Sequence, residues 1–506
     1  MADGVEKKAS ETSAPPRPTP KKKRKSHYFE SSDRGNAERL AAVCRGRIYY
    51  VERWRKWIVW TGKCWQPDDA GTRIKAMALK AVDSILEEAK KEEDQDRKKA
   101  LLKWKRASGD ARRIFAMIEI CNALPGMCIS HDKLDQKPWL LNCKNGVLDL
   151  TTGKLQKHAP GDLLTKVIDV NFNAKAKAPL FEKFMATVLP DRDVRDFLQR
   201  FAGYCATGDV SERMFVVLHG GGRNGKSVFL RCLQKALGPY AKTAAPGLLM
   251  AKQQDSHPAE LADLYGARVA LASEIRKGRT FDEEAVKRLT GNDRLKARFM
   301  REDWWEYDPY FKLLIAANHK PKVKDTSDSF WDRIAFIPFN VRITDKQIDR
   351  KLPSKLEKTG ELEGVLNWII KGCVAWQKDG LKVPETVKAA TKAYREAEDI
   401  VGRFLSEKCV IDAAAAVLAD SPLLPTSDLI SAGRRWCEAN GLMWPFTEKD
   451  LAERLGELGA VPGRSKHARG WRGVTLLQPV RKVVPPRGIS PTSLQVTKKP
   501  TPASPN

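Results

Sequence analysis

A glycine-rich loop between a predicted strand and a predicted helix constrains the fold of this chain more than any other feature. The segment Gly220-Gly221-Gly222-Arg223-Asn224-Gly225-Lys226-Ser227 fits the pattern G-x-x-x-x-G-K-[ST]. It follows an apolar run at 215–218 and precedes a helical stretch at 228–237. Glycines let the backbone curl so that its N–H groups and the start of the helix face an anion. Because chance matches seldom have this setting, the segment predicts a nucleotide phosphate site.

Two side chains of this loop have defined roles in the chemistry that the motif supports. The lysine of such a loop neutralises the β- and γ-phosphates, and the following hydroxyl binds magnesium. We therefore expect Lys226 to be catalytic, Ser227 to be a metal ligand, and ATP and Mg²⁺ to be the cofactors. The predicted nucleotide-binding residues are Gly220, Gly221, Gly222, Arg223, Asn224, Gly225, Lys226, Ser227 and Val228.

Polar side chains follow two of the apolar runs beyond the loop. Strands are predicted at 215–218, 268–272, 312–316 and 334–337, with helical stretches between them, as in a sheet covered by helices. After the second strand comes Glu274, which we expect to activate water and to join Ser227 at the metal. Asn318 follows the third strand. It is expected to orient the attacking water or sense the γ-phosphate, and a strand-end turn is the alternative.

An arginine stands just before the last predicted strand. If subunits form a ring, Arg333 would reach the ATP of a neighbour as an arginine finger. The alternative is a surface arginine that caps a helix. A phosphate cradle alone does not separate a kinase, a GTPase and a motor, so Glu274, Asn318 and Arg333 carry that distinction.

The charge of the chain predicts a polyanionic partner. The formal net charge is +27, and basic residues also dominate internal stretches such as 98–113 and 294–301. A nucleic acid is the natural partner of such a protein. The run Pro20-Lys21-Lys22-Lys23-Arg24-Lys25 resembles a nuclear import signal, and a nonspecific phosphate-binding tail is the alternative.

Cysteine usage and hydropathy bear on the compartment. The ten cysteines include no C-x-x-C pair and none lies beside a histidine at ligand spacing, which favours reduced thiols and argues against a zinc site. No apolar run approaches the roughly 20 residues of a membrane span. We expect a cytoplasmic protein without a membrane partner, nuclear only if the 20–25 run acts as an import signal.

Regions flanking the loop and strands have their own patterns. Aromatic residues between 33 and 70 predict short strands, with core packing favoured over base stacking. Residues 73–124 have helical spacing, and 145–154 predicts a hairpin.

Near the C-terminus, Ser427 and Thr447 are expected to cap two helices. A basic turn and an apolar strand, Trp471 to Leu477, follow them, which favours a winged helix; a protein-docking module is the alternative.

The order of these motifs resembles superfamily 3 helicases, and more narrowly the phage, plasmid and poxvirus primase-helicase branch. The resemblance is carried by the loop, the acid after 270–273, the segment Lys287-Arg288-Leu289-Thr290-Gly291-Asn292-Asp293, Asn318-His319-Lys320-Pro321 and Trp331-Asp332-Arg333-Ile334. Segments 141–150 and 197–204 look like the domain that precedes the motor in that branch. Because only about 30 tail residues precede the recognisable region, we expect no primase domain in this sequence.

The resemblance implies a homohexameric ring that threads one DNA strand, with a possible separate primase as a further partner. It also implies a DNA-contacting hairpin at about 291–305, for which a basic surface loop is the alternative. The implied DNA-binding residues of the motor are Lys287, Arg294, Lys296, Arg298, Phe299, Met300 and Arg301. In the C-terminal unit, Lys449, Arg454, Lys466, Arg469 and Arg472 are the expected DNA contacts.

The expected fold is an α/β P-loop NTPase core of AAA+ type with an N-terminal α+β domain and a C-terminal winged-helix domain. The predicted division is a basic tail (1–30), an N-terminal domain (31–135), a hairpin and helical collar (136–206), the ATPase (207–342), a helical extension (343–399), a winged-helix-like domain (400–478) and a second basic tail (479–506). The predicted function is an ATP-dependent DNA helicase. The alternatives are a replication initiator or loader, a nonmotor P-loop enzyme such as a kinase, and a structural DNA-binding protein with a vestigial ATP site.

Overall fold

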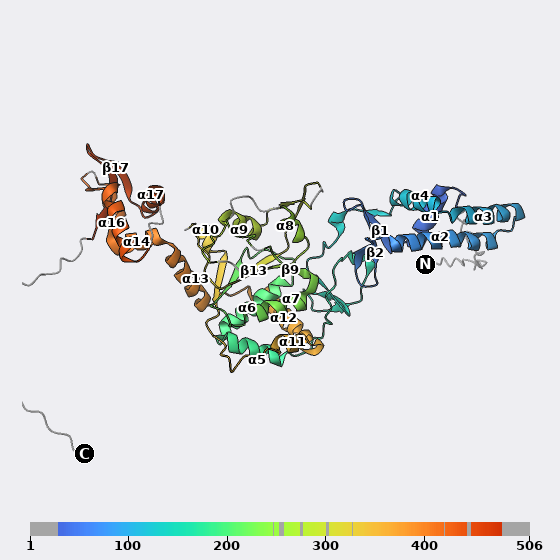
Figure 1. Cartoon of the computed structure of the whole chain (residues 1–506), viewed down its shortest axis with the longest axis horizontal. Coiled ribbons are helices and arrows are strands. Elements are labelled where there is room, and N and C mark those ends of the chain that lie inside the picture. The colour runs from blue at the N-terminus through green and yellow to red at the C-terminus, as the bar shows by residue number, and fades with distance from the viewer. Residues whose placement is uncertain are drawn as a thin grey trace, which may run out of the picture. The chain divides into compact units, whose positions relative to one another are not determined.

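The computed structural model describes residues 29–245, 247–251, 258–273, 277–299, 303–325, 327–418, 420–442 and 447–477. The chain divides into two compact units, Met1–Thr391 and Lys392–Asn506 (Figure 1). Within the described ranges, no helix is long and apolar enough to cross a membrane.

The N-terminal part of the first unit combines a small sheet with four helices. Its strands lie in the order β3-β2-β1-β4. Trp65 is fully buried and Trp57 is 8% exposed, so the expected core packing of these aromatic residues is confirmed. The elements are α1 (Asp33–Cys44), β1 (Ile48–Val51), β2 (Lys56–Trp60), β3 (Trp65–Pro67), α2 (Thr72–Lys91), α3 (Gln95–Ser108), α4 (Ala111–Asn122), β4 (Cys128–Ile129) and the 3-10 helix η1 (His131–Lys133).

A second small sheet precedes the central one. The predicted hairpin is present as β5 (Leu140–Cys143) and β6 (Gly146–Asp149). Strand β7 (Leu155–Gln156) pairs with the other side of β6. After η2 (Pro160–Asp162) come α5 (Pro179–Val188) and α6 (Arg192–Cys205). Helix α6 approaches α12 (Thr359–Asp379) so closely that a Cβ on Gly203 would clash with the backbone of Cys373. Helices before and after the central sheet therefore share its core.

The central sheet has five parallel strands in the order β14-β8-β13-β10-β9. These are β8 (Phe215–His219), β9 (Ala241–Thr243), β10 (Val269–Ala272), β13 (Lys312–Ala317) and β14 (Ile334–Pro338). The four predicted strands are confirmed, and β9 was missed because three residues give no apolar pattern. The helices of this region are α7 (Lys226–Leu237), η3 (Gly238–Tyr240), α8 (Pro258–Asp263), α9 (Glu283–Thr290), α10 (Asp328–Trp331), α11 (Leu352–Leu356) and α13 (Glu385–Glu398).

Two buried cations tie the amino-terminal edge of this sheet to the segment after α6. Lys312 Nζ donates hydrogen bonds to the carbonyl oxygens of Thr207 at 2.6 Å and Asp209 at 3.0 Å. Arg268 donates to the carbonyl oxygens of Ala206 and Leu140, each at 2.6 Å. Burial lowers the pKa of Lys312 to about 7. Backbone carbonyls that would otherwise lack partners at this edge are thereby satisfied.

The second unit alternates helices with short antiparallel strands. Its elements are α14 (Ile400–Lys408), β15 (Cys409–Ile411), α15 (Ala413–Ala416), β16 (Leu423–Pro425), α16 (Thr426–Ala439), α17 (Glu448–Glu457), β17 (Val461–Arg464), β18 (Arg469–Arg472) and β19 (Val474–Leu476). The sheets pair β16-β18-β17 and β15-β19. The single strand expected from Trp471 to Leu477 is interrupted at Gly473, whose φ is +74°.

One of the two predicted helix caps in this unit is confirmed and one is wrong. Thr447 caps α17 in a capping box with Asp450. Ser427 does not cap α16, because the extended backbone of β16 continues through Pro425 and the helix begins at Thr426, without a side-chain cap. Ser427 lies two positions after the actual N-cap, Pro425, and so belongs to the first turn of the helix.

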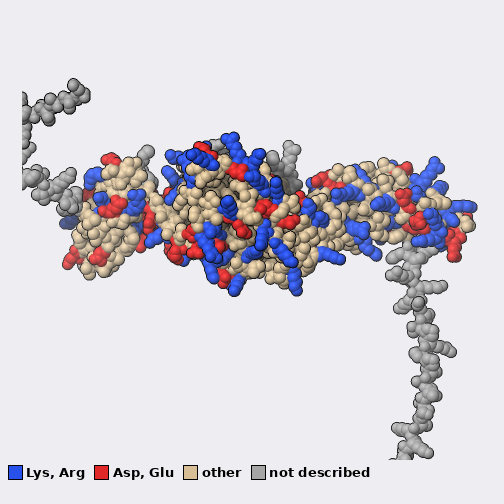
Figure 2. Space-filling view, turned by 90° about the horizontal axis from the view of Figure 1, so that it is seen from below, with Lys and Arg blue, Asp and Glu red and all other residues tan. Residues whose placement is uncertain are grey.

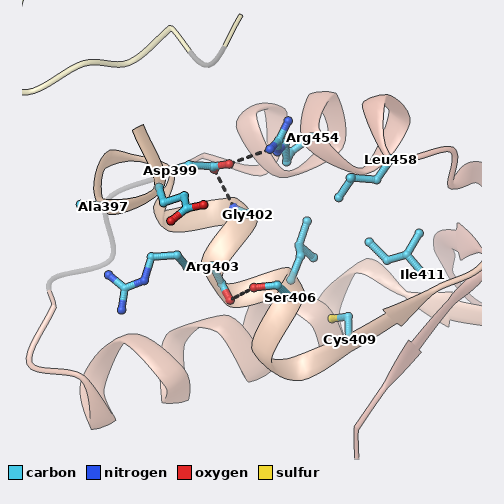
Figure 3. A pocket seen from close by; sticks show the side chains of 11 residues that line it. Ala397, Asp399, Gly402, Arg403, Ser406, Cys409, Ile411, Arg454 and Leu458 are labelled. Atoms are coloured by element: carbon cyan, nitrogen blue, oxygen red, sulfur yellow. Dashed lines mark hydrogen bonds and ion pairs between the residues drawn. The ribbon is translucent and has the colours of Figure 1, made fainter. Parts of the chain in front are cut away.

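A groove of about 760 Å³ lies between α14, α17 and β15 in this unit, and one carboxylate organises its rim (Figure 3). Asp399 caps α14 by accepting a bond from the Gly402 N–H at 2.7 Å, and it also pairs with Arg454 at 2.7 Å. Arg454 is further paired with Glu457 at 2.6 Å. This guanidinium therefore holds α14 and α17 together, and these ion pairs would have to open before it contacted a phosphate.

We predict that Asp399→Ala lowers the free energy of unfolding of this unit by about 2 kcal/mol, because a helix cap and a half-buried ion pair are lost together. The matched control is Asp412→Ala. Asp412 caps α15 through the N–H groups of Ala414 and Ala415 and has no arginine partner among its hydrogen bonds in the described residues. Its removal should cost about 1 kcal/mol. Native-state hydrogen exchange of α14 in the full chain measures both, and equal costs would contradict the role of the ion pair.

Candidate nucleotide site and nucleic-acid hairpin

The glycine-rich loop joins β8 to α7 at the carboxyl edge of the central sheet. Helix α7 begins at Lys226, and Gly225 before it has a φ of +87°. A Cβ on Gly225 would meet Val188 Cγ1 at 2.7 Å and Phe184 Cε2 at 2.9 Å. The loop therefore curls over α5 in a backbone conformation that only glycine adopts without strain. Such a cradle presents backbone N–H groups and a helix start to an anion, which fits a nucleotide phosphate.

Lys226 is held inside this loop. It is 4% exposed, and its Nζ donates to the carbonyl oxygen of Gly220 at 2.6 Å and to Asn224 Oδ1 at 3.0 Å. Asn224 is itself fixed, because its Nδ2 donates to the carbonyl oxygen of Phe339 at 3.2 Å. Burial lowers the pKa of Lys226. A desolvated ammonium with only neutral acceptors gains a great deal from a phosphate, so the chemistry of the residues fits the expected cofactor.

Gly220 is the position where this geometry tolerates a side chain least. A Cβ there would overlap both Asn224 Nδ2 and the Phe339 carbonyl oxygen, whereas a Cβ on neighbouring Gly221 meets nothing within 4 Å. We expect Gly220→Ala to lower the free energy of unfolding by about 2 kcal/mol through overpacking, and Gly221→Ala to change it little. Denaturant titration of both variants without nucleotide checks this. A Gly220→Ala protein as stable as Gly221→Ala would contradict the packing described here.

A cavity of about 380 Å³ opens beside the loop, and it brings Asn318 to the predicted phosphate site. Strands β8 and β13 pair Ala317 with His219, so Asn318 and Gly220 follow them side by side. Ser227 also lines this cavity and is exposed, so its hydroxyl is the group of this residue that would bind a magnesium ion. The structure therefore brings together Lys226, Ser227 and Asn318.

One wall of the cavity was missed by sequence reasoning. It consists of the apolar residues Phe184, Ile343, Ile348, Leu352 and Pro353. The segment after β14 is held against the loop, because the Ile343 N–H donates to the Arg223 carbonyl oxygen at 2.8 Å and Asp345 pairs with the Arg223 side chain at 2.6 Å. Apolar surface next to a phosphate cradle suits a nucleobase. No local pattern links the loop to Phe184, which precedes it, or to residues 343–353, which follow it by more than 100 positions.

Glu274 lies outside the described residues. The strand before it, β10, pairs with β13 and not with β8, so β13 lies between β10 and the loop strand. Ser273, the last described residue after β10, is therefore on the same edge of the sheet as the loop, two strands away. The role of Glu274 as catalytic base and metal ligand stays a prediction.

Arg333 lies at the amino-terminal edge of the sheet, whereas the loop lies at the carboxyl edge. Ile334 pairs with Phe215 at the start of β8, and the loop begins only after His219. The strand spans about 16 Å, at roughly 3.3 Å per residue. Arg333 is half-buried, and its guanidinium donates to Thr290 Oγ1 at 3.0 Å and to the Ser329 carbonyl oxygen at 2.9 Å. This arginine is therefore far from the loop of its own chain.

The expected hairpin is present as β11 (Leu295–Ala297) paired with β12 (Trp305–Tyr307). Lys296 and Arg298 both lie over the ring of Trp304, at 5.3 and 4.9 Å from its centroid. Phe299 is 39% exposed, and Trp304 is 46% exposed. Cations and aromatic faces are thus interleaved on one surface, an arrangement that suits phosphates and bases. Two predicted contacts, Met300 and Arg301, lie outside the described residues.

The remaining predicted DNA contacts have differing surroundings. Lys287 lies on α9 and pairs with Asp325 at 2.6 Å, and Arg294 pairs with Asp308 at 3.4 Å. Lys449 is exposed on α17, 3.7 Å from Glu453. Arg469 and Arg472 lie on β18, and Lys466 is exposed in the turn before it. Figure 2 shows Lys and Arg side chains spread over the visible surface, with acidic groups among them.

Comparison with known protein families places the chain in a class. Residues 37–190 match the family described as D5 N terminal like, and residues 218–333 match a family of unknown function, DUF5906. The second match covers the loop, Asn318 and Arg333. The chain is thus a mixed α/β protein in which a segment similar to the D5 N terminal like family precedes a parallel sheet.

Curated relatives narrow this class. The chain is 27% identical over 329 residues to "Putative helicase L207/L206" of Acanthamoeba polyphaga mimivirus, covering 61% of this chain and 34% of the relative. It is 29% identical over 308 residues to "Putative helicase 022R" of Frog virus 3, with 57% and 31% coverage. It is 21% identical to "Putative primase C962R" of African swine fever virus (strain Badajoz 1971 Vero-adapted), with 61% and 34% coverage. These similarities confirm the predicted resemblance to the phage and poxvirus primase-helicase branch.

These relatives are longer proteins than the sequence described here, which spans about a third of their length. Among solved structures, the C-terminal region (305–718) of NrS-1 is similar at 12% identity, with a TM-score of 0.40 and coverage of 66% of this chain and 92% of that one. A likeness at that TM-score has no bearing on the activity.

Proposed function

We propose that this chain is an ATP-dependent DNA helicase, a ring-forming motor of superfamily 3 type with a P-loop ATPase core. The observation that carries the proposal is the placement of the predicted catalytic residues on the central sheet. Lys226, Ser227 and Asn318 share one cavity at the carboxyl edge, whereas Arg333 lies at the other edge. An arginine so placed completes a nucleotide site only in a neighbouring subunit, which favours a ring over a solitary enzyme.

In this proposal each residue has a separate task. Lys226 leaves its carbonyl and amide acceptors to neutralise the β- and γ-phosphates, Ser227 holds the magnesium ion, and Asn318 orients the attacking water. Glu274 accepts the proton of that water. A neighbour's Arg333 stabilises the charge that develops on the transferred phosphoryl group, and phosphate release relaxes that contact.

The partner in this proposal is DNA, threaded through a homohexamer in the host cytoplasm. The basic and aromatic surface of the β11–β12 hairpin supports contact with a single strand inside the ring. Helices α16 and α17 followed by the β17–β18 hairpin support a winged helix in the second unit, with exposed Arg469 as its best placed DNA contact. A separate primase would supply the primers.

Strand displacement tests this proposal. Duplexes with a 3′ tail, a 5′ tail or no tail are incubated with the protein, with and without ATP and Mg²⁺. The proposal expects ATP-dependent separation of one tailed substrate and none of the blunt duplex. Rapid ATP turnover on DNA without separation of either tailed duplex would favour the initiator or loader instead, and turnover that ignores DNA would favour a nonmotor enzyme.

A further inference from the structure

Thr290 fixes the direction in which the Arg333 side chain points. It is 7% exposed, and its hydroxyl accepts a hydrogen bond from Arg333 Nη1 at 3.0 Å. The same hydroxyl donates to the Val286 carbonyl oxygen at 2.7 Å. Because this second bond occupies its hydrogen, the lone pairs of Oγ1 are presented to the guanidinium in a defined orientation. A side chain as flexible as arginine is thereby held in one conformation before any nucleotide arrives.

The guanidinium keeps donors for a further ligand. An arginine has five N–H groups, and among the described residues Arg333 uses Nε on Ser329 and one N–H of Nη1 on Thr290. Within the described residues, one N–H of Nη1 and both of Nη2 remain for another acceptor, and a phosphate matches a guanidinium geometrically.

Thr290 also lies at a mechanical junction. It is the last residue of α9, and β11 begins at Leu295, so only residues 291–294 separate it from the hairpin. The Gly291 N–H is bonded to the Lys287 carbonyl oxygen at 2.9 Å, which fixes the start of this link to α9. A displacement of the hairpin by DNA would therefore reach the Thr290 hydroxyl through a short connection.

We propose that Thr290 is a positioning residue that aims Arg333 at the nucleotide of a neighbouring subunit and couples this aim to DNA binding at the β11–β12 hairpin. The proposal rests on the proposed function, because it requires a nucleotide site shared between subunits. It assigns to Thr290 no contact with substrate. Its effect is on the turnover that DNA stimulates and not on the affinity of its own subunit for ATP.

Three substitutions test this role. Thr290→Val removes the hydroxyl at constant shape, and Thr290→Ser keeps the hydroxyl. Thr391→Val is the matched control, because Thr391 Oγ1 likewise donates to a carbonyl one turn earlier, that of Val387 at 2.9 Å, and accepts from an N–H, that of Phe336 at 3.1 Å, with no arginine involved. Should the valine variant not fold, Thr290→Ala removes the same hydroxyl and takes its place.

The expected result is a loss of about tenfold or more in the kcat of DNA-stimulated ATP hydrolysis for Thr290→Val, the size expected when a bond to a charged group is lost. The ratio of turnover with DNA to turnover without DNA falls with it. The KM for ATP stays unchanged, Thr290→Ser restores kcat, and Thr391→Val behaves like the parent. Mixing Thr290→Val with Lys226→Ala subunits restores turnover, because one contributes an intact loop and the other an aimed arginine.

The outcomes distinguish a failure of the shared nucleotide site from a failure of the role of Thr290. If Arg333→Ala hydrolyses ATP normally on DNA, the shared site of the proposed function fails, whatever Thr290 does. If Arg333→Ala is inactive but Thr290→Val turns over normally, only the role of Thr290 is overturned. A Thr290→Val defect that Lys226→Ala subunits do not rescue would also overturn it, because the defect would then lie in the loop of the same chain.

Discussion

The Lys226→Ala variant should lose ATP hydrolysis and strand separation by at least about a hundredfold while retaining its affinity for single-stranded DNA. The reason is electrostatic: the ammonium is the one buried cation of the loop within the described residues, and a preorganised charge at a phosphoryl-transfer site is worth at least that factor. The hairpin that we expect to hold DNA is a separate element, β11–β12, so binding should survive.

The control for this variant lies on the same helix. Lys235 is exposed in the last turn of α7, so Lys235→Ala removes the same charge without touching the loop. Steady-state ATPase and fluorescence anisotropy with labelled single-stranded DNA measure both variants. A Lys226→Ala protein that turns over ATP within a few-fold of Lys235→Ala would show that the nucleotide phosphates bind elsewhere.

The Arg333→Ala variant should bind ATP normally and lose DNA-stimulated hydrolysis by about a thousandfold, the usual effect of removing an arginine finger. Its own nucleotide cavity is untouched, because Arg333 lies at the far edge of the sheet from the loop. Arg192→Ala, which removes an exposed arginine 3.7 Å from Asp196 on α6, should leave hydrolysis unchanged.

Mixing gives this prediction its sharpest form. When inactive Arg333→Ala and Lys226→Ala subunits are combined in equal amounts, about a quarter of the interfaces in a randomly assembled ring carry an intact loop facing an intact arginine. ATPase activity should therefore reappear on mixing and rise with the time allowed for subunit exchange. Two proteins that remain inactive together, although they co-assemble by light scattering, would contradict a shared site.

Sequence patterns located the central sheet because its strands are short apolar runs and because the loop motif fixes which strand comes first. The position of Asn318 near the loop was also predictable, since the carboxyl ends of parallel strands share one edge of a sheet. A hairpin at about 291–305 was predicted by resemblance, and the structure places it at 295–307 and supplies its register.

Other features depend on contacts that no local pattern contains. Most of the apolar wall of the nucleotide cavity comes from residues 343–353, more than 100 positions after the loop, and Phe184 joins it from α5. Lys312 and Arg268 are basic residues at strand starts, so sequence alone favours solvent exposure, yet each is 5% exposed or less and bonded to backbone carbonyls. Thr290 stood inside a recognised motif, but its bond to Arg333 joins residues 43 positions apart.

The most direct test of the central claim is a cryo-electron microscopy structure of the full chain with a nonhydrolysable ATP analogue, Mg²⁺ and single-stranded DNA. The account predicts closed rings in which the triphosphate lies in the turn between β8 and α7, beside Lys226, with Arg333 of the adjacent subunit near the terminal phosphate. A monomer on DNA, or a ring whose triphosphate sits away from that turn, would contradict it.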